Sequence, residues 1–467
     1  MLLLTTVSSL VFALASQQSL QGQLPKDDLG VTQFLLEHPE YNGKGIRVAV
    51  LDTGIDPGHP FLQTTPDGRR KIVDWYDATT DALLPTDYVV KQSAGHITGL
   101  SGRDLDLGKY AKYQEFHLGR IGAEFFPSSL SGRIAGDRNA DFEEAQVRYN
   151  EAQVGAEESD ATLESVIAAR NANALMADGP VYDVIVYSTS AGWRVVIDSD
   201  EDGDLGEEQA LAPFKESGDW ATLGDESNMN YAVNVSDDGN MTSIYFDAHG
   251  HGTHVAGIIG SYEGEGARLN GIAPGVEFVA IKIGDSKVGG STSGFAVSKA
   301  LDYAVEAGCQ IANMSFGGPS FYADGREPDD WVVEEAAKRG LLLVTSAGNE
   351  GPTLSTVGSP GTSEAAWSIA AAIWPDTQKV SYSSLNPAEP LLFDFSSRGP
   401  LPTGDLGIDF AAPGAALSAL PSWTLAKGES WNGTSMAAPQ MAGCVALLEC
   451  AAMGEGLPTD HETLHRA

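Results

Sequence analysis

The chain has 467 residues, of which 42% are hydrophobic, and its 64 Asp and Glu against 28 Lys and Arg give a formal net charge of −36 at pH 7. At this length we expect one large domain with an insertion, or two domains. The negative charge excludes nucleic-acid backbones and anionic membranes as preferred partners, because both would repel it. Cys309, Cys444 and Cys450 are too few and too scattered for a disulfide framework.

The first segment, Met1–Ala15, is an apolar run that ends in the small-residue pattern Ala13-Leu14-Ala15. Such a run is typical of a signal peptide, so we expect a secreted or periplasmic protein. The run lacks the Lys or Arg that usually precedes the apolar part. A cytoplasmic protein is therefore the alternative if the run is not a signal.

Buried strands alternate with helical patterns through most of the chain. Each strand is an apolar run closed by turn or polar residues, as in parallel sheets that are covered on both faces. We therefore predict an α/β fold, a parallel sheet with helices on both faces, formed by residues 16–57 and 247–467. The predicted strands are Ile46–Asp52, Glu277–Ile283, Ile311–Ser315 and Leu341–Ser346, and the helices between them are Ser293–Ala307 and Trp331–Arg339.

Residues 58–246 have a different pattern, which predicts an inserted α+β domain. A charged stretch at Ala135–Ala177 reads as an exposed helix. Two pairs of strands follow, Tyr182–Tyr187 with Trp193–Ile197, and Tyr231–Val235 with Thr242–Phe246. The second pair is joined across Asp238-Gly239, a strong hairpin signal.

Four short motifs carry the candidate chemistry. Asp52 directly follows a strand, and His251 begins a His-Gly-Thr-His run in which Gly252 permits a tight turn. Ser435 stands at the mouth of a small-residue helix, where backbone N–H groups favour a developing anion. Asn349, after Ala347-Gly348, offers a side-chain amide donor beside a glycine that leaves space for a substrate.

Together these motifs resemble the subtilisin-like serine peptidases, including the chain order Asp, His, Ser. The resemblance implies a catalytic triad of Asp52, His251 and Ser435, working through an acyl-enzyme. It also implies an oxyanion hole made by the Asn349 amide and the Ser435 backbone N–H. The substrate would lie along Ser315, Phe316, Gly317 and Gly348, and no cofactor is required.

Two further histidines, His249 and His254, lie close to His251 in the sequence. His254 is one helical turn further on and is expected to be packed inside the protein. His249 lacks neighbouring carboxylates or cysteines at zinc-ligand spacing, so we expect no metal there.

The long stretch between Asp52 and His251 narrows the resemblance to tripeptidyl peptidase II. The segments that carry it are Gly99–Arg103, Asp178–Asp183, Trp193–Leu205, Asn230–Asn240, Leu354–Gly361, Phe395–Pro400 and Pro421–Leu425. Compared with that family the chain stops soon after Ser435, which suggests a truncated C-terminus. The resemblance implies peptide or protein substrates and leaves the oligomeric state open.

Two positions depart from the tripeptidyl peptidase pattern. In that family a pair of glutamates holds the free α-amine of the substrate, and the matching residues here are Thr292 and Gly318. An uncharged pair cannot supply the preference for an ammonium group that such an exopeptidase needs. We therefore predict a serine endopeptidase. The alternatives are a tripeptidyl-peptidase acting on free N-termini and an inactive binding module that keeps the fold.

An acidic loop at Asp198–Gln209 has calcium-loop spacing. Its ligands would be Asp198, Asp200, Asp202 and the Asp204 backbone oxygen, with Gly203 at the turn. The twelfth position is Gln209, whereas an EF-hand loop has a bidentate Glu there. A calcium site and a solvated acidic turn both remain open.

Overall fold

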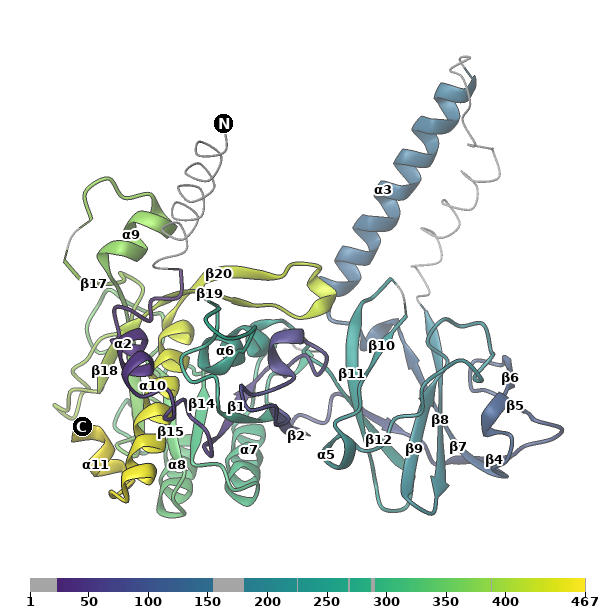
Figure 1. Ribbon diagram of the computed structural model, residues 1–467, viewed down its shortest axis with the longest axis horizontal. Helices are drawn as coiled ribbons and strands as arrows, with labels where there is room; N and C mark the ends of the chain where they lie inside the picture. The colour runs from purple at the N-terminus through teal and green to yellow at the C-terminus, as the bar shows by residue number, and fades with distance from the viewer. Residues whose placement is uncertain are drawn as a thin grey trace, which may run out of the picture.

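The computed structural model describes residues 23–153, 180–224, 226–267, 269–286, 290–387 and 389–466. The chain forms two bodies side by side, a helix-covered sheet and a mainly β body (Figure 1). The predicted signal peptide, Met1–Ala15, and the C-terminal part of the predicted helix Ala135–Ala177 lie outside the described residues.

The first body is built on one sheet with the strand order β17-β16-β15-β14-β1-β13-β2, and β18 pairs with β16. All of these pairs are parallel except β16 with β17. The inner strands are almost entirely buried, which explains their unbroken apolar runs. The strands are β1 (Arg47–Asp52), β2 (Ile72–Asp77), β13 (Glu277–Lys282), β14 (Ile311–Met314), β15 (Leu342–Ser346), β16 (Ala366–Ile373), β17 (Leu391–Leu392) and β18 (Phe410–Pro413).

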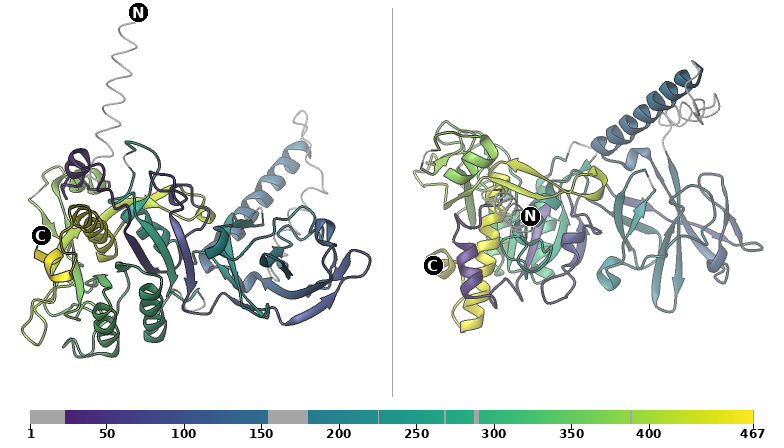
Figure 2. Two further views of the ribbon diagram at one scale, coloured as in Figure 1. Left: turned by 60° about the horizontal axis from the view of Figure 1, so that its bottom comes forward. Right: turned by 45° about the horizontal axis from the view of Figure 1, so that its top comes forward.

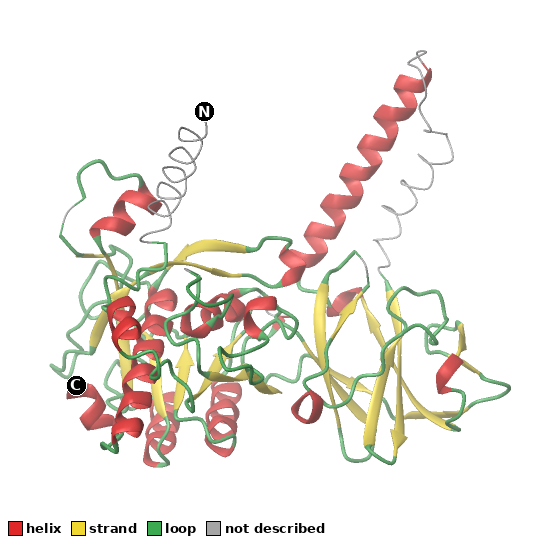
Figure 3. Cartoon of the chain, in the orientation of Figure 1, coloured by secondary structure: helices red, strands yellow, loops and turns green. Residues whose placement is uncertain are grey.

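Helices cover both faces of this sheet, which confirms the predicted fold class. Apolar side chains of α6 and α10 join the core on one face, and those of α7 and α8 join the core on the other. Figure 3 shows these helices gathered around the sheet. The helices are α2 (Val31–Glu37), α6 (His251–Gly260), α7 (Gly294–Glu306), α8 (Pro328–Lys338), α9 (Pro375–Tyr382), α10 (Thr434–Glu455) and α11 (His461–Arg466).

Helix α10 is long and apolar enough to cross a membrane by length and composition alone. Two thirds of its most apolar window are buried inside the protein, among the strands β14, β15, β16 and β18. Its apolar character is accounted for by this central position in the core.

The second body contains the two predicted hairpins. Its sheets have the orders β10-β11-β12-β3 and β4-β7-β8-β9, with a separate β5-β6 pair. Helix α3 (Ser128–Gln153) projects away from these sheets (Figures 1 and 2). The other elements are β3 (Leu83–Pro85), β4 (Tyr88–Lys91), β5 (His96–Thr98), β6 (Asp104–Asp106), β7 (Glu115–Gly122), β8 (Val181–Thr189), β9 (Gly192–Ile197), α5 (Phe214–Ser217), β10 (Ala221–Leu223), β11 (Met229–Val235) and β12 (Met241–Tyr245).

The predicted start of the inserted domain, residue 58, is too early. Strand β2 lies inside the predicted range 58–246, yet it pairs in parallel with β13 at the end of the central sheet. Leu62 and Ile72 belong to the core of that sheet. Because β2 is an edge strand, it is only partly buried at Val73 and Tyr76, and its sequence lacks the continuous apolar run of an inner strand. The inserted domain therefore begins after Asp77.

One hairpin connects the two bodies. Strands β19 (Ala415–Ala419) and β20 (Gly428–Asn432) are antiparallel and extend from the central sheet to the base of α3 (Figure 1). A short 3-10 helix, Ser422–Thr424, forms the tip of the hairpin. Further 3-10 turns lie at Pro60–Leu62, Gly108–Tyr110 and Ala123–Phe125.

Candidate active site

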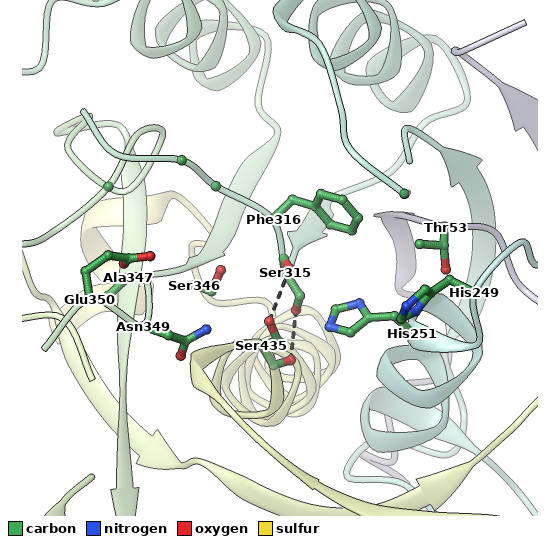
Figure 4. Close-up of a pocket in the computed structure, with 15 residues that line it drawn as sticks. Thr53, His249, His251, Ser315, Phe316, Ser346, Ala347, Asn349, Glu350 and Ser435 are labelled. Carbon is green, nitrogen blue, oxygen red and sulfur yellow. Dashed lines mark hydrogen bonds between the residues drawn. The ribbon is translucent and has the colours of Figure 1, made fainter. Parts of the chain in front are cut away.

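Four of the predicted site residues lie at the ends of core elements. Asp52 is the last residue of β1, His251 is the first of α6, and Ser435 lies in the first turn of α10. Asn349 follows β15. Parallel strands end at the same edge of a sheet, so the fold brings together residues that are far apart in the sequence (Figure 4).

Asp52 orients His251 directly. The Asp52 side chain is fully buried, and its two oxygens lie 2.8 and 3.0 Å from Nδ1 of His251. Since Nδ1–H donates to this carboxylate, Nε2 is left as the basic nitrogen. Figure 4 shows the imidazole turned toward Ser435.

The close packing of α6 against β1 requires Gly252. A Cβ at this position would lie 1.9 Å from the Gly54 carbonyl oxygen. The backbone N–H of Gly252 also donates to Thr53 Oγ1 at 3.0 Å. The glycine of the His-Gly-Thr-His motif therefore allows the base and its carboxylate to approach each other.

Ser435 is held against the neighbouring wall. Its Oγ donates to the Ser315 carbonyl oxygen at 3.2 Å, and Ser315 Oγ donates to the Ser435 carbonyl oxygen at 2.9 Å. For catalysis the Ser435 hydroxyl must turn toward Nε2 of His251. Catalytic hydrogen bonds often form only when substrate is bound, so this arrangement is compatible with a nucleophile.

The Asn349 amide is oriented by the helix that carries Ser435. Its Oδ1 accepts hydrogen bonds from Thr434 N at 3.0 Å and from Thr434 Oγ1 at 3.1 Å. With the oxygen held in this way, Nδ2 remains available as a donor. The Ser435 N–H, in the first turn of α10, has no partner within the helix. The two donors can stabilise one oxyanion.

A pocket of about 280 Å³ joins these groups, and Figure 4 shows the side chains around it. The predicted substrate wall, Ser315, Phe316, Gly317 and Gly348, lines it. Of the two positions matched to the substrate-binding glutamates, Gly318 lines this pocket, whereas Thr292 lines a different one. The remaining lining residues are Thr53, His249, His251, Gly290, Ser346, Ala347, Asn349, Glu350, Gly358 and Ser435.

The other two histidines differ from His251. His254 is fully buried, its ring stacks on Trp431 at 4.6 Å, and its Nε2 donates to the Glu429 carbonyl oxygen at 3.0 Å. Burial lowers the pKa of His254 to about 3, so this histidine is neutral. His249 lines the pocket, and it belongs to no metal-binding group among the described residues.

Sequence reasoning missed Asp247, a fully buried carboxylate four residues before His251. Its Oδ1 accepts hydrogen bonds from Thr53 Oγ1 at 2.8 Å and Gly250 N at 2.8 Å, and its Oδ2 accepts one from Thr253 N at 3.0 Å. Asp247 thus fixes the start of α6 against the end of β1. The available signal was an acidic residue between the last predicted strand and the histidine motif.

The pKa of His251 results from opposing effects. Burial disfavours the charged imidazolium, but the charge of Asp52, the hydrogen bond to Asp52 and the charge of Asp247 together outweigh burial. The pKa of His251 is therefore raised above its usual 6.5. A more basic imidazole is better able to accept a proton from a serine hydroxyl.

The acidic loop brings Asp198, Asp200 and Asp202 together, with one oxygen of each within 4.8 Å of the others. The side chain of Asp204 accepts from Gly206 N at 2.8 Å. Arg103 already provides a positive charge at this loop, since its Nη1 lies 3.0 Å from the buried Asp198 carboxylate. The spacing of the carboxylates suits a cation, and Arg103 neutralises part of their charge.

Comparison with known proteins agrees with this geometry. A family model described as the subtilase family matches residues 43–459. Tripeptidyl-peptidase 2 of Oryza sativa subsp. japonica is 34% identical over 98% of this chain and 36% of its own length. Tripeptidyl-peptidase 2 of Caenorhabditis elegans is 35% identical over 91% of this chain and 33% of its own length. The chain thus spans about a third of the length of these curated relatives.

The extent of similarity differs between groups of relatives. Subtilisin NAT of Bacillus subtilis subsp. natto is 32% identical, over 44% of this chain and 47% of its own length. The crystal structure of tripeptidyl peptidase 2 matches 91% of this chain and 34% of its own, with a TM-score of 0.66 at 24% identity. The fold of that structure therefore extends over the inserted domain as well as the central sheet.

Proposed function

We propose that this chain, which belongs to the subtilase family, is a serine peptidase that cleaves peptide bonds through an acyl-enzyme on Ser435. The observation that carries the proposal is the pocket shared by His251, Asn349 and Ser435, with Asp52 behind the histidine. Peptides or proteins are the substrates.

The reaction follows from the positions of these groups. Ser435 Oγ attacks the scissile carbonyl carbon while its proton passes to Nε2 of His251. The carbonyl oxygen becomes an oxyanion that accepts from Asn349 Nδ2 and Ser435 N–H. When the C–N bond breaks, His251 returns the proton to the leaving amine. Water, activated by His251, then hydrolyses the ester and regenerates Ser435.

We favour internal cleavage over release of tripeptides. Gly318 offers no charge to a substrate ammonium, and Thr292 lies along a different cavity. The one carboxylate among the described lining residues is Glu350, whose Oε2 accepts from Ser397 Oγ at 3.0 Å. A single carboxylate already engaged by Ser397 is a poor substitute for the pair that fixes a free N-terminus.

Tripeptidyl-peptidase activity is the second candidate, and the similarity to tripeptidyl-peptidase 2 over almost the whole chain favours it. Matched peptides with free and acetylated N-termini distinguish the two modes. An endopeptidase cleaves both at similar rates. If acetylated peptides are inert and free ones release tripeptides in sequence, the tripeptidyl mode is correct.

An inactive binding module is the remaining alternative. Fluorophosphonate probes react with activated serines, so the purified chain should be labelled and the Ser435→Ala variant should not. Absence of any Ser435-dependent label would remove the peptidase proposal.

Export from the cell, based on Met1–Ala15, stays a prediction. Fractionation of cells that express the chain from Met1 would test it.

A further inference from the structure

The β19–β20 hairpin, residues Ala415–Asn432, contacts both bodies of the molecule. Trp423 at its tip is 5% exposed and belongs to the apolar core of the inserted domain, with Met229, Phe246 and Ala248. The indole Nε1–H donates to the Asp247 carbonyl oxygen at 2.9 Å. The hairpin belongs to the first body, which contains the central sheet, yet its tip is part of the core of the inserted domain.

A polar cluster fixes the same tip. Asp56, which follows β1, accepts from Ser422 N at 2.7 Å through Oδ2. Its Oδ1 accepts from Nδ2 of Asn230, a residue of β11 in the inserted domain, at 2.9 Å. Asn230 Nδ2 also lies 3.0 Å from Ser422 Oγ. Because Asp56 and Asn230 are 2% and 7% exposed, loss of one partner would leave buried polar groups unsatisfied.

The two strands of the hairpin lead from this tip to the catalytic residues. On β19, Ser418 Oγ donates to the His254 carbonyl oxygen at 2.7 Å. On β20, Trp431 stacks on His254, and its ring lies 6.2 Å from that of His251. Strand β20 ends at Asn432, three residues before Ser435.

A second connection runs through Asp247. Its main-chain oxygen accepts from Trp423, and its side chain accepts from Gly250 N and Thr53 Oγ1. Gly250 directly precedes His251, and Thr53 directly follows Asp52. A displacement of Trp423 would therefore be transmitted to the residues beside the base and its carboxylate.

We propose that this hairpin is a clasp through which the inserted domain positions His251 and Ser435, with Trp423 and Asn230 as positioning residues. The inference rests on the proposed peptidase function. Reacting groups tolerate little misplacement, and a shift of about 1 Å can cost about 100-fold in rate. The substrate wall Ser315–Gly317 follows β14, outside the clasp. Loosening the clasp should therefore lower kcat and leave KM nearly unchanged.

The experiment compares Trp423→Phe, which keeps an aromatic ring but loses the N–H, with Asn230→Ala. The control is Trp331→Phe, at a position on α8 that is 59% exposed. Rates are measured on free or acetylated peptides, whichever the wild type cleaves, and are divided by the fraction of chain that a fluorophosphonate labels at Ser435, so that unfolded protein does not count. We expect kcat to fall about tenfold or more in both clasp variants, with KM within about twofold, and the control to match the wild type.

The pH profile gives a readout that a merely structural role would not move. The charged and titratable groups around His251 are Asp52 from β1, Asp247 and His249 from the segment before α6, and His254 on α6. If the clasp fixes Asp247, the acid limb of kcat/KM moves to lower pH in Trp423→Phe.

Four results would overturn the proposal. Clasp variants that melt earlier but keep wild-type kcat and pH profile would show that the hairpin contributes only stability. Equal loss in the Trp331→Phe control would show a nonspecific effect. A wild-type chain that cleaves no peptide would refute the peptidase function itself, and with it this inference. An active wild type with unaffected variants refutes the inference alone.

Discussion

The two bodies of the molecule differ in how their functional residues can be recognised. The central sheet places His251, Asn349 and Ser435 around one pocket, with Asp52 buried behind His251, and each of these residues stands in a short motif with a nearby glycine. The inserted domain, from Leu83 to Tyr245, contributes no described lining residue to that pocket. It acts on the site through buried contacts at its boundary, above all those of Asn230 and Trp423. Chemistry is therefore visible in motifs, whereas the support of that chemistry is visible only in packing.

The largest effect is expected when a reacting group in the central-sheet body is removed. Ser435→Ala and His251→Ala should each reduce peptide hydrolysis by about 10⁶-fold, the order measured when such residues are lost in subtilisin. The double variant should be little worse, because the residues act as a unit. Steady-state rates with a folding check by circular dichroism measure this. Substantial activity in either folded single variant contradicts the assignment.

A smaller loss is expected at the oxyanion hole. Asn349→Ala should lower kcat by about 10²–10³-fold, as loss of the corresponding amide does in subtilisin, with little change in KM. The amide acts on charge that develops only in the transition state. Asn386→Ala, at an exposed loop position after α9, serves as a matched control and should retain most activity. An increase in KM as large as the fall in kcat would argue against the oxyanion role.

The choice between internal and N-terminal cleavage can be shifted by one residue. A Cβ at Gly318 would meet no heavy atom within 4 Å, so the side chain of Gly318→Glu can begin at this position without displacing its neighbours. The new carboxylate should raise the rate on free relative to acetylated peptides by about tenfold, because hydrogen bonds to charged groups contribute about 1.5–3 kcal/mol. Gly318→Gln keeps the shape without the charge. An equal effect of both variants would exclude an ammonium preference as the cause.

The raised pKa of His251 predicts a pH dependence. The base must be neutral to accept the serine proton, so kcat/KM falls as the pH drops through the pKa of His251, with a midpoint above 6.5. Asp247→Asn removes one charge that raises this pKa and should move the midpoint to lower pH. Asp238→Asn, in the exposed hairpin turn, should not. A profile unaffected by Asp247→Asn would show that the charge of Asp247 does not contribute to the raised pKa of His251.

The smallest effect is expected at the acidic loop of the inserted domain. Calcium bound by Asp198, Asp200 and Asp202 would stabilise the folded chain, since a ligand of the native state alone raises Tm. Because Arg103 already neutralises part of this charge, we expect the melting temperature of the inserted domain to rise by about 2–4 °C, the size that about 1 kcal/mol produces in a domain of about 150–250 residues. Thermal melts in chelator and in millimolar calcium test this. An Asp200→Asn variant should lose the shift, and identical melts of the wild type would count against the site.

The sequence by itself determined the fold class and the candidate catalytic residues. The apolar runs that became β1, β13, β14 and β15 are buried on both faces, and such strands need no tertiary information to be recognised. Hairpins such as β11–β12 follow from local turn residues, here Asp238-Gly239. The motifs around Asp52, His251, Asn349 and Ser435 are equally local, because each combines a reactive side chain with the small residues that its turn requires.

Only the tertiary structure decided where the inserted domain begins and what supports the triad. Two aspartates interrupt the apolar residues of the edge strand β2, and the pairing that makes it part of the sheet comes from β13, far along the chain. Asp247, Asn230 and Trp423 have no periodicity or spacing that predicts their partners. Their role arises from contacts between segments separated by up to about two hundred residues, and such contacts depend on how the whole chain packs.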